Sequence, residues 1–213
     1  MRNVNLDDKY TADKGVVFMN GTQALVRVPM MQREIDRADG LNTAGFISGY
    51  RGSPLGTYDL ELWRAQKHLK AHDILFQPGV NEDLAATAVW GTQMLDGTPG
   101  VTKDGVFAIW YGKGPGVDRS GDPFKHGNMA GSHRHGGVLV VAGDDHSGKS
   151  STVAHASEMA LVHAGMPILA PSTVQDVIDF GLLGFAMSRY TGLWTGFKLT
   201  NETLEQTMTV DIG

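Results

Sequence analysis

Short, continuous runs of apolar residues, each followed closely by glycine or proline, constrain the fold of this chain more than any other feature. The runs lie at residues 43–50, 74–77, 106–111, 138–142 and 167–170. Continuous runs of this length are typical of strands that are buried on both faces of a parallel sheet. Because segments with helical spacing separate them, the pattern predicts βαβ units with right-handed crossovers. We therefore expect an α/β fold with three layers, αβα, around a mostly parallel sheet.

Helical periodicity recurs between these runs, at residues 24–35, 84–95, 153–164 and 174–185. Pro29 falls inside the first segment, so it should kink that helix or mark its start. The last segment has the clearest period. Ser172, followed by Gln175 three residues later, predicts a capping box at its beginning.

The chain of 213 residues is long enough for one sizeable domain, and no linker divides it. We expect a single domain over residues 1–213, in which the polar residues 200–213 start a connecting segment. The net charge of −5 and the lack of a basic run argue against nucleic-acid or anionic-membrane binding. The sequence shows no signal peptide and no membrane span, so a cytoplasmic location is expected.

The sequence contains no cysteine. Disulfides, thiolate metal sites and iron–sulfur clusters are therefore excluded within this chain. His133 and His135 could bind a metal, but no set of carboxylates or thiols at ligand spacing accompanies them. The sequence therefore predicts no metal site.

Ligands of parallel α/β sheets bind beyond the carboxyl ends of the strands, so the loops after the apolar runs are the candidates for a site. The first loop reads Tyr50-Arg51-Gly52-Ser53-Pro54. Arg51 offers a planar fork that matches a carboxylate, and Ser53 adds a donor beside it. A Gly/Pro turn with a solvated arginine explains the same residues without a function.

The second loop carries Asn81 and Glu82 at the start of a predicted helix. The apolar stripe of that helix is formed by Leu84, Ala88 and Leu95. Asn81 is a good N-cap, and a carboxylate in the first turn complements the helix dipole, which explains both residues without a function. If Glu82 points inward instead, its carboxyl could share a proton with a ligand nitrogen.

The third and fourth loops offer weaker signals. Lys113 and Arg119 follow residues 106–111 in a glycine-rich segment and could meet an anion. Residues 143–150 match the P-loop pattern GxxxxGK[ST], directly after an apolar run and before a helical segment. Asp144 and Asp145 lie inside that match and would repel phosphates. A nucleotide-binding P-loop stays an alternative on these grounds.

The segments that contain these loops also form an ordered set, which covers nearly the whole chain. They read LDDKYT, GTQALVR, GLNTAGFISGYRGSPLG, GVNEDLAATAVWGTQ, GKGPGVDRSGD, HGGVLVVAGDDH and SSTVAHASE. Together they resemble the N-terminal, pyrimidine-binding domain of the fused indolepyruvate:ferredoxin oxidoreductases. These enzymes belong to the thiamine diphosphate-dependent 2-oxoacid:ferredoxin oxidoreductase family.

The resemblance implies roles for individual residues. Glu82 takes the position of the catalytic glutamate that hydrogen-bonds N1′ of the aminopyrimidine ring of thiamine diphosphate. The residues implied to contact the cofactor are Tyr50, Gly52, Ser53, Pro54 and Asn81. Those expected at the substrate are Arg51, Ser53, Lys113, Asp144, Asp145 and His146. Because relatives are expected to differ at Gly148 and Lys149, the P-loop match is interpreted as accidental.

The resemblance also implies what the chain lacks. The whole enzyme would oxidatively decarboxylate indolepyruvate, or a related aryl or branched 2-oxoacid, to an acyl-CoA and pass electrons to ferredoxin. The diphosphate and its magnesium are held by another domain with a GDG-type motif, and this chain has neither that motif nor the iron–sulfur domains. We therefore expect a homodimeric domain that docks against a diphosphate-binding domain and is inactive in isolation. A non-catalytic interaction module is the remaining alternative.

Overall fold

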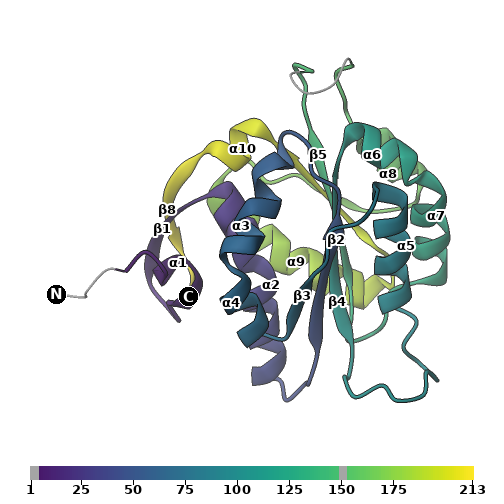
Figure 1. The fold of residues 1–213 in the computed structure, drawn as a ribbon, viewed down its shortest axis with the longest axis horizontal. Helices are drawn as coiled ribbons and strands as arrows, with labels where there is room; N and C mark the ends of the chain where they lie inside the picture. The colour runs from purple at the N-terminus through teal and green to yellow at the C-terminus, as the bar shows by residue number, and fades with distance from the viewer. Residues whose placement is uncertain (1–4, 149–152) are drawn as a thin grey trace.

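A six-stranded parallel sheet forms the middle layer of the protein. The computed structural model describes residues 5–148 and 153–213. The strands are β2 (Ala44–Gly49), β3 (Ile74–Phe76), β4 (Val106–Lys113), β5 (Val138–Asp144), β6 (Ile168–Leu169) and β7 (Thr195–Thr200), in the order β3-β2-β4-β5-β7-β6. Helices cover both faces of this sheet (Figure 1). The predicted three-layer α/β fold is therefore confirmed.

The two helical layers cover two separate cores. One layer contains α2 (Gly21–Ala38), η1 (Leu55–Thr57), α3 (Tyr58–Arg64), α4 (Gln66–Ala71) and α9 (Val174–Thr191). The other contains α5 (Glu82–Thr92), α6 (Gly114–Arg119), α7 (Gly121–Ala130) and α8 (Glu158–His163) (Figure 1). Along β4, Ile109 and Tyr111 pack in the first core, whereas Ala108 and Trp110 pack in the second. The apolar runs of β4 and β5 are continuous because both faces of these strands are buried.

A small antiparallel ribbon lies apart from the main sheet. It pairs β1 (Val16–Asn20) with β8 (Thr207–Asp211), between α1 (Asp8–Thr11) and α10 (Asn201–Glu205) (Figure 1). Residues 200–213, expected to start a connecting segment, thus form α10 and β8. Val210 and Ile212 are buried there. Periodicity missed β8 because its partner β1 lies at the opposite end of the chain.

The first long helix, α2, runs without interruption from Gly21 to Ala38. Its N-terminus is fixed by a capping box in which Asn20 accepts a hydrogen bond from Gln23 N at 2.8 Å and Gln23 accepts one from Asn20 N at 3.1 Å. Pro29 lies inside the helix and does not mark its start. Among the described residues, no helix has the length and apolar character needed to cross a bilayer.

The capping box of α9 lies one residue later than predicted. Thr173, rather than Ser172, is the N-cap: its Oγ1 accepts from Asp176 N at 3.1 Å, and Asp176 Oδ2 accepts from Thr173 N at 2.9 Å. The exposed side chain of Ser172 donates only to the Asp176 carboxylate, at 2.8 Å.

We expect Thr173→Ala to lower the free energy of unfolding by about 1 kcal/mol, because the first turn of α9 loses the acceptor for a backbone N–H. Ser172→Ala is the matched control and should cost clearly less. Urea denaturation of the two variants measures the difference. Equal losses would show that Thr173 is not the energetic cap.

Candidate functional site

Four loops that follow parallel strands meet at one edge of the sheet. β2, β4 and β5 are neighbours, and β3 lies beside β2. Tyr50 N donates to Tyr111 O at 3.0 Å, which joins the loop after β2 to β4. Gly79 N donates to Gly49 O at 2.9 Å, which joins it to the loop after β3. The predicted site residues therefore lie around the carboxyl ends of adjacent strands, where α/β proteins bind ligands.

Glu82 is the first residue of α5 and is 9% exposed. Asn81 caps the helix, because its side chain accepts from Leu84 N at 3.0 Å. The buried face of α5 consists of Glu82, Ala85, Ala86 and Val89. The predicted stripe is therefore wrong, and Leu84 is 53% exposed. Because 82, 85, 86 and 89 share one helical face, the carboxyl group heads an apolar stripe instead of facing solvent.

The Glu82 side chain lies against the backbone of α6. A Cβ added to Gly116 would stand 2.6 Å from Glu82 Cγ and 3.0 Å from its Oε1. Trp110 Nε1 donates to the backbone oxygen of Glu82 at 2.9 Å. Within residues 5–148 and 153–213, the Glu82 carboxylate itself makes no hydrogen bond or ion pair. The next residue differs in this respect: Asp83 pairs with Arg119 at 2.8 Å, and both are exposed enough to be solvated.

The loop after β2 brings Arg51 and Lys113 to the same edge. Arg51 is exposed and forms no ion pair with the described residues. A Cβ on Gly52 would stand 2.6 Å from Lys113 Cδ, so the aliphatic part of Lys113 lies across the glycine. Pro54 contacts β5, since a Cβ on Gly143 would be 3.0 Å from Pro54 Cδ.

The remaining residues of that loop differ in exposure. Tyr50 is 43% exposed, whereas Ser53 is half-buried. Both are therefore at the surface of the site, where a ligand could contact them.

The acidic residues predicted at the end of β5 form hydrogen bonds within the protein. Asp144 is buried and accepts from Ser157 N at 2.7 Å and Ser157 Oγ at 2.5 Å, with Lys198 Nζ at 3.7 Å. Asp145 is also buried and accepts from Ser147 Oγ at 3.1 Å. Its neighbour His146 is exposed. Asp144 thus ties the end of β5 to the residue before α8.

The P-loop alternative falls partly on Lys149 and Ser150, which lie outside the described residues. Gly143 and Asp144 belong to strand β5, not to a loop. Among the described residues after this match, 153–157 are not helical, and α8 begins at Glu158. The described geometry therefore does not favour phosphate binding at this turn.

Sequence reasoning missed Asp59, which lies on α3 beside the same loops. It lines a cavity of about 250 Å³ together with Gly49, Tyr50, Arg51, Trp63, Pro78 and Gly79. Burial raises the pKa of the Asp59 carboxyl, while the nearby Tyr111 hydroxyl and the charge of Arg51 act to lower it. The sequence placed Asp59 next to Tyr58 in a helical turn, but its distance from Arg51 is decided by the packing of α3 on β4.

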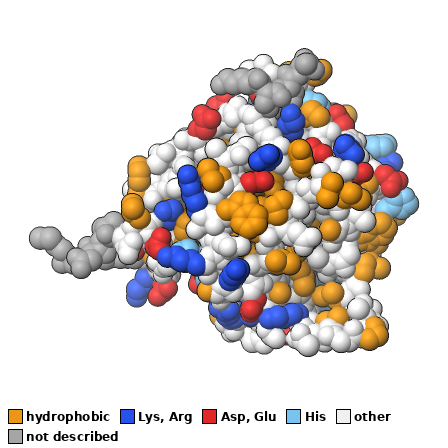
Figure 2. Space-filling model, viewed as in Figure 1, with side chains coloured by type: hydrophobic (Ala, Val, Ile, Leu, Met, Phe, Trp, Pro, Cys, Tyr) orange, Lys and Arg blue, Asp and Glu red, His pale blue; other side chains and the backbone are white. Residues whose placement is uncertain are grey.

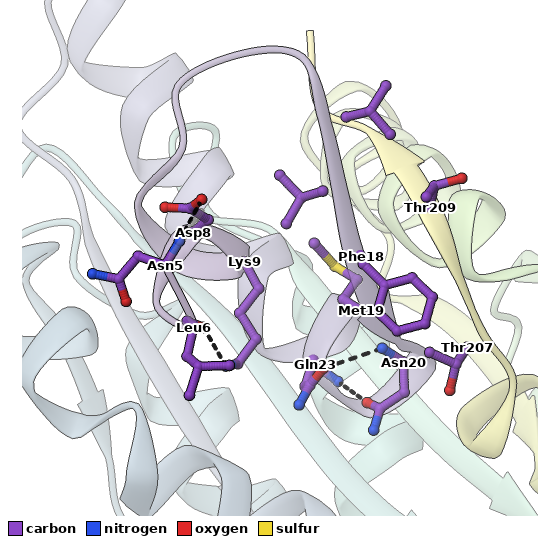
Figure 3. Close-up of a pocket in the computed structure, with 12 residues that line it drawn as sticks. Asn5, Leu6, Asp8, Lys9, Phe18, Met19, Asn20, Gln23, Thr207 and Thr209 are labelled. Carbon is purple, nitrogen blue, oxygen red and sulfur yellow. Dashed lines mark hydrogen bonds between the residues drawn. The ribbon is translucent and has the colours of Figure 1, made fainter. Parts of the chain in front are cut away.

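Another cavity, of about 600 Å³, lies beside the β1–β8 ribbon, away from these loops (Figure 3). Several of its polar groups are already paired: Asn20 and Gln23 form hydrogen bonds with each other, and Lys9 Nζ donates to Leu6 O at 2.6 Å.

The two histidines considered for a metal do not form a metal site with other described residues. The His133 ring pairs with Asp96 at 3.2 Å. In the described parts of the chain, no group of three or more histidine or carboxylate residues is placed to hold a metal.

No protein-family model matches the sequence, and no curated protein matches it either. Its fold is similar to that of a 2-oxoglutarate:ferredoxin oxidoreductase from Magnetococcus marinus, solved with 2-oxoglutarate, coenzyme A and succinyl-CoA bound. The TM-score is 0.69 and the sequence identity 17%, over 92% of this chain and 31% of that chain. The present chain thus spans less than a third of that protein. The likeness shows that the two proteins share this αβα fold.

Proposed function

We propose that this chain is the aminopyrimidine-binding domain of a thiamine diphosphate-dependent 2-oxoacid:ferredoxin oxidoreductase of the indolepyruvate type. One observation carries the proposal: Glu82 is a largely buried residue at the carboxyl edge of a parallel sheet, and its carboxylate makes no hydrogen bond or ion pair with the described residues. The shared fold with a 2-oxoacid:ferredoxin oxidoreductase supports it. The assignment to the indolepyruvate type rests on the resemblance of the sequence motifs.

The residues present fit the aminopyrimidine ring of the cofactor. A carboxyl group at the head of an apolar stripe suits a ring nitrogen with which it shares a proton. Gly116 leaves room for the Glu82 side chain in this position, because a Cβ there would stand 2.6 Å from Glu82 Cγ. When bound, thiamine diphosphate supplies the nucleophilic carbon that attacks the 2-oxoacid. The diphosphate and its magnesium belong to another domain in this proposal, since the chain has no GDG-type motif.

Each residue of the site then has a defined role. Glu82 holds a proton at the ring nitrogen, and the loop at Tyr50, Gly52, Ser53 and Pro54 contacts the ring beside Asn81. Arg51 binds the substrate carboxylate through its guanidinium fork, with Lys113 as a second positive charge near it. The buried Asp144 and Asp145 hold the turn that carries His146 at the rim.

A partly apolar surface surrounds this edge. Figure 2 shows apolar side chains gathered over α3, β3 and α5, flanked by charged ones. The large exposed apolar residues of this region are Tyr50, Leu60, Trp63, Leu75, Val80 and Leu84. Patches of this kind mark protein–protein contacts. The surface is therefore suited to docking the diphosphate-binding domain or the second subunit of a cytoplasmic homodimer. In the complete enzyme of this proposal, iron–sulfur domains pass the electrons to ferredoxin, and coenzyme A accepts the acyl group.

The proposal is tested by 2-oxoacid-dependent, thiamine diphosphate-dependent reduction of ferredoxin in the complete enzyme. Glu82→Gln should slow this activity by a factor of about 10²–10⁴ and leave the protein folded. The isolated chain should bind the cofactor weakly or not at all, since it lacks the diphosphate site. Tight, magnesium-dependent binding by the isolated chain would contradict this division of labour.

Gly116→Ala tests the position of Glu82 without changing its chemistry. The added Cβ would be 2.6 Å from Glu82 Cγ, so the carboxyl must move or α6 must shift. We expect turnover by the complete enzyme to slow about tenfold or more, because a displacement of about 1 Å at a reacting group is costly. Gly121→Ala, where a Cβ would meet nothing within 4 Å, is the matched control. Equal activities for the two variants would show that Gly116 does not position Glu82.

A further inference from the structure

The cavity of about 250 Å³ beside Arg51 contains one positive and one negative group. Arg51 lines it from the loop after β2, and Asp59 lines it from α3. The aromatic ring of Trp63 and Pro78 line it as well. The cavity therefore combines aromatic and apolar lining with a cation and an anion.

One oxygen of the Asp59 carboxylate, Oδ1, is buried and has no hydrogen-bond partner among the described residues. The Tyr111 hydroxyl is equally buried and makes no hydrogen bond of regular geometry there, but it lies close enough to the Asp59 carboxyl to act on its pKa. Tyr111 cannot turn away, because its ring packs edge-on against Tyr58 at 5.2 Å between centroids and lies 6.4 Å from Phe76. A carboxylate with an unpaired oxygen in such surroundings acts strongly on any charge that enters the cavity.

We propose that Asp59 is a specificity-determining residue, which admits 2-oxoacids with an uncharged side chain and excludes those whose side chain ends in a second carboxylate. This inference rests on the proposed function. The 1-carboxylate that every 2-oxoacid carries is neutralised by Arg51 at the cavity. Lys113 lies across Gly52 and does not line the cavity. A second carboxylate inside the cavity therefore has no further cation among the lining residues and would face Asp59. Like charges at such short range in a partly buried site repel each other strongly.

The test compares two substrates in the complete enzyme: phenylpyruvate, with an uncharged side chain, and 2-oxoglutarate, with a carboxylate. The wild type should strongly prefer phenylpyruvate in kcat/KM. Asp59→Asn keeps the shape and removes the charge, so it should raise the 2-oxoglutarate-to-phenylpyruvate ratio of kcat/KM at least tenfold. Asp59→Glu keeps the charge and should keep the preference. Asp83→Asn, which removes an exposed carboxylate on α5, should leave the ratio unchanged.

A binding measurement separates this inference from the proposed function. Trp63 lines the cavity, so its fluorescence should report an entering ligand. The Trp63 signal is the fluorescence change of each protein minus the change of the same protein with Trp63→Phe. 2-Oxoglutarate should change the fluorescence of Asp59→Asn at concentrations at least tenfold lower than those needed for the wild type. This readout does not need turnover and holds even if Asp59→Asn is inactive.

Two results would overturn the inference: an unchanged substrate ratio in an active Asp59→Asn enzyme, or equal 2-oxoglutarate affinity in Asp59→Asn and the wild type. The proposed function fails on different grounds, namely retained turnover in Glu82→Gln. A selective loss of the substrate preference in Asp59→Asn, with Glu82→Gln inactive, supports both.

Discussion

Glu82→Gln is expected to slow the turnover of the complete enzyme, measured as ferredoxin reduction driven by a 2-oxoacid, by a factor of about 10²–10⁴, the usual contribution of a positioned proton-transfer group. Glutamine has nearly the same shape as glutamate and can fill the space beside Gly116. It cannot carry the shared proton, so only the chemistry is lost. The KM for the 2-oxoacid should change much less than kcat, because Glu82 does not contact the substrate in the proposed arrangement.

Asp83→Asn is the control for this variant. Asp83 follows Glu82 in the same helical turn, but its carboxylate pairs with Arg119 at the surface. Surface pairs of this kind contribute about 0–1 kcal/mol to stability, so Asp83→Asn should keep both fold and activity. Full activity of Glu82→Gln, or an equal loss in both variants, would remove Glu82 from its assigned role.

Asp36→Ala is expected to lower the free energy of unfolding by about 3–5 kcal/mol, the usual cost of removing one partner of a buried ion pair. Asp36 is fully buried on α2 and accepts two hydrogen bonds from Arg189 of α9, at 2.6 and 2.9 Å. Thr43 Oγ1 and Gln32 Nε2 donate to the same carboxylate at 2.6 and 2.8 Å. Its removal leaves the guanidinium of Arg189, 17% exposed, without its anion. Urea denaturation of the purified chain measures the loss.

Asp73→Asn is the matched control for Asp36→Ala. Asp73 also pairs with an arginine, Arg33 at 3.1 Å, but its side chain is 44% exposed. Its backbone φ of 56° is one that asparagine tolerates. We expect a loss of about 1 kcal/mol or less. A similar small loss in Asp36→Ala would show that the buried pair does not stabilise the contact of α2 with α9.

The same network predicts acid sensitivity. Burial acts to raise the pKa of Asp36, but hydrogen bonds from Arg189 and Thr43 outweigh it and hold the pKa below its ordinary value. A carboxyl whose pKa is lower in the folded state contributes stability above its unfolded pKa, and this is lost as the pH falls through the folded pKa. Stability should therefore fall below about pH 4 more steeply in the wild type than in Asp36→Ala, as urea denaturation at a series of pH values would measure.

Much of the sheet and the position of the loops that form the site could be predicted from local patterns. The apolar runs of β4 and β5 are continuous because both faces of these strands are covered, whereas Leu75 of β3 is 57% exposed. The loops after β2, β3, β4 and β5 carry the polar residues. The strands β1, β7 and β8 were not predicted, although Trp194 and Phe197 are fully buried at or beside β7. Residues 195–200 contain threonine, glycine and lysine between apolar residues, so the run is broken. The pairing of β1 with β8 joins the two ends of the chain, which no local pattern reveals.

The sequence by itself determined that this chain forms an αβα domain and that its polar loops lie at the carboxyl ends of parallel strands. Both follow from periodicity and from the geometry of right-handed βαβ units. Only the tertiary structure decided that Glu82 faces inward while Asp83 faces solvent, because the packing of α5 on β2 and β4 sets the rotation of the helix. It also decided that Asp59 lies beside Arg51 and that Asp144 is used internally by Ser157. These are contacts between separate elements of the fold, and packing alone brings them together.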